Sequence, residues 1–225
     1  MHGLNPLSIE RDVRRALQED LGSGDVTADL LPEGRAARAR VIPRQPAIIC
    51  RHAWFDACFH LVDADVSVEW LVAEGDRVSA GQTLCHVAGR ARALVSAERS
   101  ALNFLQTLSA TATTTATYVE AIRGTRTRIL DTRKTLPGLR EAQKYAVRTG
   151  GGENHRMGLH DAILLKENHI LAAGSLTSAV TLARKLHPAI LLEVEVETFG
   201  ELREALSAAR IDRRRRPTLH AIAIA

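Results

Sequence analysis

Cationic side chains gather in one stretch of the sequence, residues 131–170, beside two short apolar runs. The stretch reads DTRKTLPGLREAQKYAVRTGGGENHRMGLHDAILLKENHI, and its cations are Arg133, Lys134, Arg140, Lys144, Arg148, His155, Arg156 and Lys166. Arginine can bind a carboxylate or phosphate through two parallel hydrogen bonds, whereas lysine acts as a point charge. Because fixed cations repel one another, such a set is stable mainly when an anion lies among them. The stretch therefore predicts a pocket for an anionic ligand.

Carboxylates follow a later apolar run, AILLEVEVE, in which Glu193, Glu195 and Glu197 alternate along one face of a predicted strand. Inside a barrel that face must be polar, which favours a functional role over simple solvation. Mg²⁺ prefers carboxylate and phosphate oxygens. We therefore predict that these acids hold Mg²⁺, which in turn holds phosphates. The expected substrates are a small carboxylate-bearing molecule and a phosphorylated one.

Two other interpretations of the same stretch are weaker. The triple glycine at 150–152 is a weak signal for a phosphate-binding loop and is more typical of a flexible turn. His155, His160 and His169 could be taken for a zinc site, but their spacing fits no familiar tetrahedral pattern.

Strand-like and helix-like segments alternate after Gly124. We expect strands in 127–134, 161–168 and 189–197, and helices over 138–148, 176–186 and from 201 to 209. Each predicted strand ends in polar residues, and the carboxyl ends of the strands form the active site of a parallel α/β barrel. A doubly wound sheet is the alternative, although the sequence lacks the GxGxxG pattern of dinucleotide-binding folds.

The first half of the chain has a different pattern. We predict a helix over 8–20 with Ser8 as its N-cap, mainly strands over 36–95 interrupted by a short helix at 53–61, and a long helix over 97–123 capped by Ser96. Arg99 would then lie in the first helical turn, where the helix dipole disfavours a cation. The hairpin-like part resembles half of a biotinyl or lipoyl carrier domain, but residues 41–95 contain no lysine for cofactor attachment.

Composition sets further limits on the class of protein. The chain has 225 residues, 45% hydrophobic and 25% charged, which is ordinary for a globular protein. Its net charge of +4 equals the contribution of the four consecutive arginines 213–216, so no nucleic-acid partner is expected. No apolar run approaches the ~20 residues of a membrane span. Three unpatterned cysteines predict buried thiols, and we expect a cytoplasmic location.

Five motifs, in combination and order, resemble the quinolinate phosphoribosyltransferase family, also called carboxylating nicotinate-nucleotide pyrophosphorylase. They are EDLGSGDVT at 19–27, SAERSALNFLQ at 96–106, DTRKTLPGLR at 131–140, GGENHRMGLHDAILLKENHI at 151–170 and EVEVE at 193–197. The resemblance covers roughly residues 5–209. It implies transfer of phosphoribose from phosphoribosyl pyrophosphate to quinolinate, with loss of CO₂ and pyrophosphate and formation of nicotinate mononucleotide for NAD synthesis.

The resemblance also implies an architecture and residue roles. The fold would be an N-terminal α/β sandwich followed by an incomplete parallel α/β barrel, and the protein a Mg²⁺-dependent homodimer or larger oligomer. Arg133, His155 and Arg156 would bind the quinolinate carboxylates, with Arg99 reaching in from the partner subunit. Lys134 and Lys166 would contact substrate and phosphates, and Glu195 would face the ribose and metal.

The family pattern ends near residue 210. The family continues with an LDN-type strand end and glycine-containing phosphate loops, whereas this chain reads IDRRRRPTLHAIAIA. We expect domains at 1–123 and 124–210 and an aberrant tail at 211–225 produced by a shifted reading frame. Two alternatives to the enzyme follow: an inactive truncated fragment that at most dimerises, or a molybdenum-operon paralogue of the same family.

Overall fold

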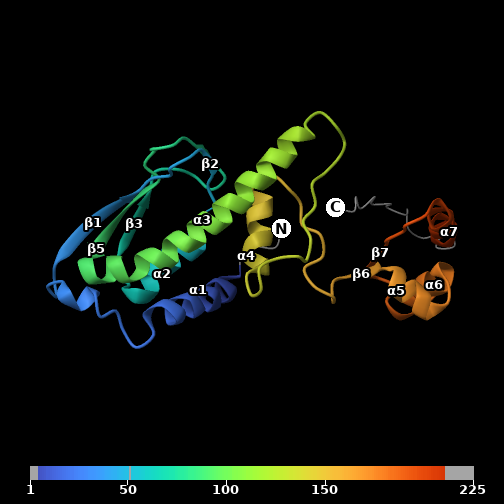
Figure 1. The fold of residues 1–225 in the computed structure, drawn as a ribbon, viewed down its shortest axis with the longest axis horizontal. Coiled ribbons are helices and arrows are strands. Elements are labelled where there is room, and N and C mark those ends of the chain that lie inside the picture. The colour runs from blue at the N-terminus through green and yellow to red at the C-terminus, as the bar shows by residue number, and fades with distance from the viewer. Residues whose placement is uncertain (1–4, 51, 211–225) are drawn as a thin grey trace. The chain divides into compact units, whose positions relative to one another are not determined.

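A computed structural model describes residues 5–50 and 52–210 of the chain (Figure 1). The structure divides into two compact units, Met1–His155 and Arg156–Ala225, and each is described by itself. The tail at 211–225, which the sequence predicted to be aberrant, lies outside the described residues.

The first unit contains an antiparallel sheet in the order β1-β5-β3. Its strands are β1 (Ala36–Val41), β5 (Cys85–Arg90) and β3 (Ser67–Trp70), and a separate pair is formed by β2 (Ala47–Ile48) and β4 (Arg77–Val78). In the register of the larger sheet, His86 stands opposite Arg40 on one side and Glu69 on the other. The predicted strand-rich segment is confirmed between residues 36 and 90, whereas residues 91–95 belong to the helix that follows.

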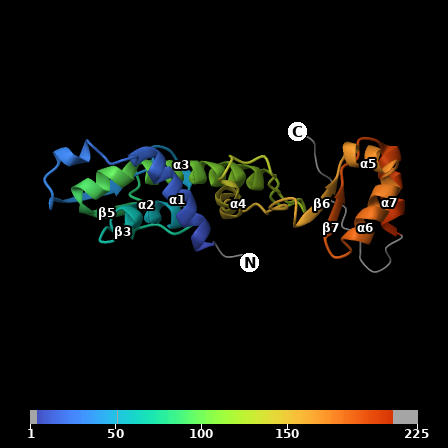
Figure 2. The same ribbon diagram turned by 90° about the horizontal axis from the view of Figure 1, so that it is seen from below.

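The helices of the first unit pack around one long helix, which lies against this sheet (Figures 1 and 2). They are α1 (Pro6–Leu21), α2 (His52–Val62), α3 (Ala91–Ala121) and α4 (Arg140–Thr149), with a short 3-10 helix η1 (Ala28–Leu30). Trp54, Phe55 and Val87 are at most 1% exposed in the core between the helices and the sheet. Burial of such large apolar side chains contributes about 1.5–3 kcal/mol each, which holds the layers together.

Two predicted helix starts are wrong. Helix α1 begins at Pro6, and the Asn5 side chain accepts the Leu7 N–H, while Ser8 is buried inside the helix. Proline at the first helical position loses no hydrogen bond there, which explains the early start. Helix α3 begins at Ala91 and not after Ser96, because strand β5 ends at Arg90 and leads directly into it.

The second unit contains a parallel pair of strands joined through two helices. Its elements are β6 (Ala162–Leu165), α5 (Glu167–Ala173), α6 (Leu176–Leu186), β7 (Leu191–Val194) and α7 (Phe199–Arg210). Strand β6 pairs with β7 in the register Ala162↔Leu191 to Leu165↔Val194. The bounds of α6 agree with the prediction, whereas α5 was not predicted and α7 begins two residues early. The described residues are α/β, as predicted, but form no closed barrel.

The strand predicted over 127–134 is largely absent from the described structure. Only an isolated parallel bridge joins Leu130 to Glu153. The Glu153 N–H donates to the Ile129 carbonyl at 2.8 Å, and the Asp131 N–H donates to the Glu153 carbonyl at 3.1 Å. The segment is therefore extended over a few residues, but its pairing is too short to form a regular β-strand. Within residues 5–50 and 52–210, no helix is long and apolar enough to span a bilayer.

Candidate active site

The triple glycine lets helix α4 and the following segment approach helix α3 closely. A Cβ atom on Gly150 would lie 2.3 Å from the Ala112 carbonyl oxygen, and one on Gly152 would lie 2.9 Å from Cγ2 of Thr115. Gly151, between them, has a φ of +89°, which few residues other than glycine adopt. The predicted turn is confirmed. It brings residues 153–155 beside residues 129–131, where the candidate side chains begin.

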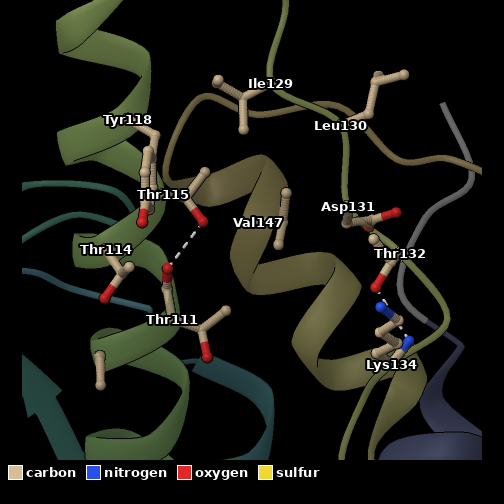
Figure 3. A pocket seen from close by; sticks show the side chains of 11 residues that line it. Thr111, Thr114, Thr115, Tyr118, Ile129, Leu130, Asp131, Thr132, Lys134 and Val147 are labelled. Atoms are coloured by element: carbon tan, nitrogen blue, oxygen red, sulfur yellow. Dashed lines mark hydrogen bonds between the residues drawn. The ribbon is translucent and has the colours of Figure 1, made fainter. Parts of the chain in front are cut away.

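The threonine-rich part of α3 faces a pocket of about 680 Å³ (Figure 3). Its lining residues are Ala110, Thr111, Thr114, Thr115 and Tyr118 of α3, Val147 of α4, and Ile129, Leu130, Asp131, Thr132 and Lys134. The Thr115 hydroxyl donates to the Thr111 carbonyl at 2.8 Å, which satisfies its donor within the helix. The Thr111 hydroxyl likewise donates to the Thr107 carbonyl at 3.1 Å. The Thr114 and Tyr118 hydroxyls and the Lys134 ammonium group make the pocket suitable for a polar ligand.

Arg133 and Lys134 follow the short extended segment. Arg133 is half-buried, and its Nε is fully buried without a hydrogen-bond partner among the described residues. An unsatisfied donor of a charged group is costly, by about 1–3 kcal/mol or more. Lys134 is exposed, and its N–H donates to the Thr132 hydroxyl at 3.0 Å. Both cations are thus available to an anion.

His155 is half-buried and lies beside Asp131 in the first unit. The His155 N–H donates to Oδ1 of Asp131 at 2.8 Å, and Nδ2 of Asn154 donates to Oδ2 of the same carboxylate at 2.6 Å. Neither Asp131 nor Asn154 was assigned a role from the sequence. Their signals were an acid directly before two cations in DTRK and an amide directly before His155.

The second unit places Lys166 and Glu195 together at the carboxyl ends of two parallel strands. Nζ of Lys166 lies 2.9 Å from Oε2 of Glu195, and the Glu195 N–H donates to the Leu165 carbonyl at 2.8 Å. The side chains are 43% and 23% exposed, so solvent screens the pair and its contribution to stability is small. Lys166 and Glu195 thus lie at the same edge of the sheet, as expected for polar residues that follow two adjacent parallel strands.

Arg156 begins the second unit and contacts the start of β6. Its Nη1 donates to the Ala162 carbonyl at 3.3 Å, leaving its other guanidinium donors for further contacts. The turn between them is closed by Asp161, which accepts the N–H groups of Met157 and Gly158. Burial acts in the opposite direction, but these N–H groups lower the pKa of the Asp161 carboxyl below its ordinary value.

Arg99 is exposed on helix α3, but not in its first turn. It is the ninth residue of the helix, so the argument from an unfavourable helix dipole is wrong. Ser96, the expected cap, instead donates its hydroxyl to Oδ2 of Asp25 at 2.8 Å. The Ala28 N–H, followed by the Ser96 hydroxyl, lowers the pKa of Asp25. The EDLGSGDVT segment is thereby attached to α3 at Ser96, less than one helical turn before Arg99.

The histidines of the zinc alternative have other contacts. Nδ1 of His169 accepts the Lys166 N–H at 3.1 Å at the start of α5. Across the described part of the chain, no group of three or more His, Cys, Asp or Glu side chains could hold a metal ion. Cys50, Cys58 and Cys85 are buried thiols outside any disulfide, as expected from the sequence.

The candidate residues therefore form two sets. Arg133, Lys134 and His155 lie in the first unit together with exposed Arg99, and Arg156, Lys166 and Glu195 lie in the second. Arg133, Lys134 and His155 lie next to the segment at 129–131. Lys166 and Glu195 lie at the carboxyl ends of β6 and β7, whereas Arg156 contacts the amino end of β6. Each set contains at least two cations, and their joint role in one anion-binding pocket stays a prediction.

Comparison with known families gives two matches that adjoin along the chain. Residues 25–109 match "Quinolinate phosphoribosyl transferase, N-terminal domain", and residues 111–220 match "Quinolinate phosphoribosyl transferase, C-terminal domain". The boundary falls within helix α3.

Individual relatives agree with these matches. The nicotinate-nucleotide pyrophosphorylase [carboxylating] of Mycobacterium leprae is 43% identical over 84% of this chain and 68% of its own length. A probable enzyme of the same name from Bacillus subtilis is 38% identical over 91% of this chain and 71% of its own. The solved structure of the nicotinate-nucleotide pyrophosphorylase from Francisella tularensis superposes with a TM-score of 0.88 at 42% identity, covering 92% of this chain and 73% of that one.

Proposed function

Because the chain belongs to the quinolinate phosphoribosyltransferase family, we propose that it transfers phosphoribose from phosphoribosyl pyrophosphate to quinolinate in NAD biosynthesis. Nicotinate mononucleotide, CO₂ and pyrophosphate are the products. The observation that carries the proposal is the Arg133 guanidinium, whose buried Nε has no partner among the described residues. A buried, unsatisfied cationic donor fits a site for a carboxylate of the substrate.

The dianion quinolinate is bound and oriented by cations of the two sets. Arg133, His155 and Arg156 bind its two carboxylates, and Arg99 is contributed by the partner subunit of a homodimer. Fixed donors hold the ring so that its nitrogen faces the anomeric carbon of the sugar. As the bond from that carbon to pyrophosphate breaks, the ribosyl carbon gains positive charge, and nearby carboxylate and phosphate oxygens stabilise it.

Two lysines and one glutamate supply the groups for the phosphorylated substrate. Lys134 of the first unit and Lys166 of the second contact substrate and phosphates, and Glu195 faces the ribose. Loss of CO₂ leaves an electron pair on a ring carbon, which the adjacent, now cationic, ring nitrogen stabilises. The cations that hold the remaining carboxylate keep the ring in place during this step.

Magnesium fits this donor set as a partner of the phosphates. Mg²⁺ is commonly bound through one or two carboxylates together with substrate phosphates, without a cage made by protein alone. Glu195 can supply such a carboxylate, since its only charged contact among the described residues is the half-exposed pair with Lys166. When bound, the ion would neutralise charge on the pyrophosphate leaving group.

The architecture and location extend the proposal. We assign residues 1–123 to an α/β sandwich and residues 124–210 to the first part of a parallel α/β barrel. A cytoplasmic location and an aberrant tail from residue 211 remain predictions. The chain spans 68–73% of the bacterial relatives described above, so its own activity is tested separately from its ability to bind quinolinate.

The experiment measures quinolinate affinity by calorimetry and nicotinate mononucleotide formation with Mg²⁺ and phosphoribosyl pyrophosphate. Arg133→Ala should lower quinolinate affinity about 10- to 150-fold, because hydrogen bonds to charged groups contribute about 1.5–3 kcal/mol. Arg44→Ala, which removes an exposed arginine, serves as the control and should bind like the wild type. Equal quinolinate affinity of Arg133→Ala and wild type would refute the proposed site. Binding without turnover would favour the inactive-fragment alternative.

Mixing two defective variants tests the shared site. If Arg99 acts across a dimer, Arg99→Ala and Arg133→Ala are each impaired, but a mixed dimer contains one site free of both substitutions. In a co-refolded mixture, each mixed dimer should therefore bind quinolinate at one of its two sites, which is about half the number in a wild-type dimer. No recovery in a mixture shown by mass spectrometry to contain mixed dimers would contradict the assignment of Arg99.

A further inference from the structure

Lys144 is a buried cation that the proposed chemistry does not use. The sequence places it among the cations of the anion pocket, but its side chain is 1% exposed in the middle of α4. Its Nζ forms an ion pair with Oδ1 of Asp131 and donates to the His155 carbonyl at 3.1 Å. The charge of Lys144 is therefore paired with that of Asp131 inside the first unit, and it is not presented to a ligand.

Asp131, Lys144 and Asn154 form a closed network around one peptide segment. Besides its bond to Asp131, Nδ2 of Asn154 donates to the Lys144 carbonyl at 2.8 Å. The network joins α4, the end of the segment at 129–131 and the chain at 154–155. All of these residues lie in the same compact unit.

Both backbone polar groups of His155 are held by the two members of the ion pair. Asp131 accepts the His155 N–H, and Lys144 donates to the His155 carbonyl. Fixing both groups restricts the backbone dihedrals of this residue, and with them the direction in which its imidazole leaves the backbone. A displacement of about 1 Å of a positioning group can cost about 100-fold in rate, so this restriction has functional weight.

Stability alone gives little reason to keep such a pair. Taking two charges out of water is costly, and replacing a buried ion pair by apolar residues of similar volume is often neutral or stabilising. A fully satisfied polar network, in contrast, fixes one local geometry. We propose that Asp131, Lys144 and Asn154 are positioning residues that orient the His155 imidazole toward a carboxylate of the substrate. This inference rests on the proposed function of His155.

Separating stability from affinity tests the proposal. Lys144→Met leaves the Asp131 charge buried and unpaired, so it should destabilise the fold strongly. The double variant Lys144→Met/Asp131→Asn removes that charge and should recover much of the stability. Quinolinate affinity, measured by calorimetry on folded protein, should nevertheless remain at least 10-fold below wild type. Lys185→Met, at an exposed lysine, is the matched control and should change neither quantity.

Amide hydrogen exchange supplies a readout that needs no substrate. The His155 N–H should be protected in the wild type and exchange faster in the double variant. A double variant that folds, keeps this protection and binds quinolinate like the wild type would overturn the proposal.

A milder variant keeps the test valid if the double variant does not fold. Asn154→Ala should lower quinolinate affinity several-fold in the wild type and have almost no effect in a His155→Ala background, because Asn154 acts through the imidazole. Additive effects would overturn the inference while leaving the role of His155 intact. Wild-type protein that fails to bind quinolinate, or His155→Ala that binds normally, would instead refute the proposed function, and the inference would fall with it.

Discussion

Gly150→Ala should destabilise the first unit, because the added methyl group has no room against helix α3. A Cβ at this position would lie 2.3 Å from the Ala112 carbonyl oxygen and 2.8 Å from Cβ of Thr115. The obstructing oxygen belongs to the backbone of a 31-residue helix and cannot move without shifting the helix. Relief therefore requires α4 and α3 to separate by more than an ångström.

The magnitude follows from two opposing effects. Gly150 has φ −78° and ψ 1°, which alanine can adopt, so loss of chain entropy in the unfolded state would by itself stabilise the variant by about 0.4–1 kcal/mol. Overpacking in a close contact costs about 1–3 kcal/mol and occasionally more. The steric effect is the larger, and we expect a net loss of about 1–3 kcal/mol. This corresponds to a fall in Tm of roughly 2–12 °C for a domain of this size.

Urea unfolding followed by tryptophan fluorescence measures this loss. Trp54 is 1% exposed, and its ring centroid lies 5.9 Å from that of Tyr145 on α4, so its emission reports on the packing of this helix. Gly34→Ala is the matched control, since a Cβ there meets no atom within 4 Å and φ is not positive. The control should be neutral or slightly stabilising. A Gly150→Ala protein as stable as Gly34→Ala would refute the argument from close packing.

Two further predictions concern ionisable groups of the first unit. Cys50, Cys58 and Cys85 are fully buried, and burial raises the pKa of Cys58 to about 12. An aromatic disulfide reagent at pH 8 should therefore modify no thiol in the native protein and three after denaturation. Rapid modification of one thiol in the native protein would contradict this prediction. Arg90, which donates to Asp63 at 2.7 Å, holds the pKa of that carboxyl below its ordinary value. The stabilisation by this pair is therefore present above about pH 4 and is lost as pH falls through the lower pKa of Asp63 in the folded state. Asp63→Asn should weaken the dependence of the free energy of unfolding on acid pH. An unchanged profile of this free energy against pH would argue against the pair.

Local pattern was enough to predict much of the secondary structure. The apolar spacing at 176–186 and the Ser175 cap determine α6, and the alternation in 67–70 determines β3. The relation of Lys166 to Glu195 also followed from the sequence, because two neighbouring parallel strands end at the same edge whatever surrounds them. The five motifs indicated the family, which the comparisons confirm.

Features set by long-range neighbours could not be predicted in this way. The sequence cannot show that β5 continues directly into α3, so the helix start and the position of Arg99 were misjudged. A strand needs a partner along its whole length, and the segment at 127–134 finds only a short one at Glu153. Hydrophobic periodicity and composition are properties of the local segment, whereas the start of α3 and the pairing of residues 127–134 depend on segments distant in the sequence.

The cationic stretch at residues 131–170 shows the same division. The sequence determined that cations collect there, next to strand-like segments, and it predicted an anionic ligand. Only the tertiary structure decided which cations remain available. Lys144 is buried against Asp131, 13 positions away, whereas Arg133 keeps a buried donor without a partner among the described residues. The physical reason is desolvation: a buried charge must find an opposite charge in the fold, and only the fold determines where that partner lies.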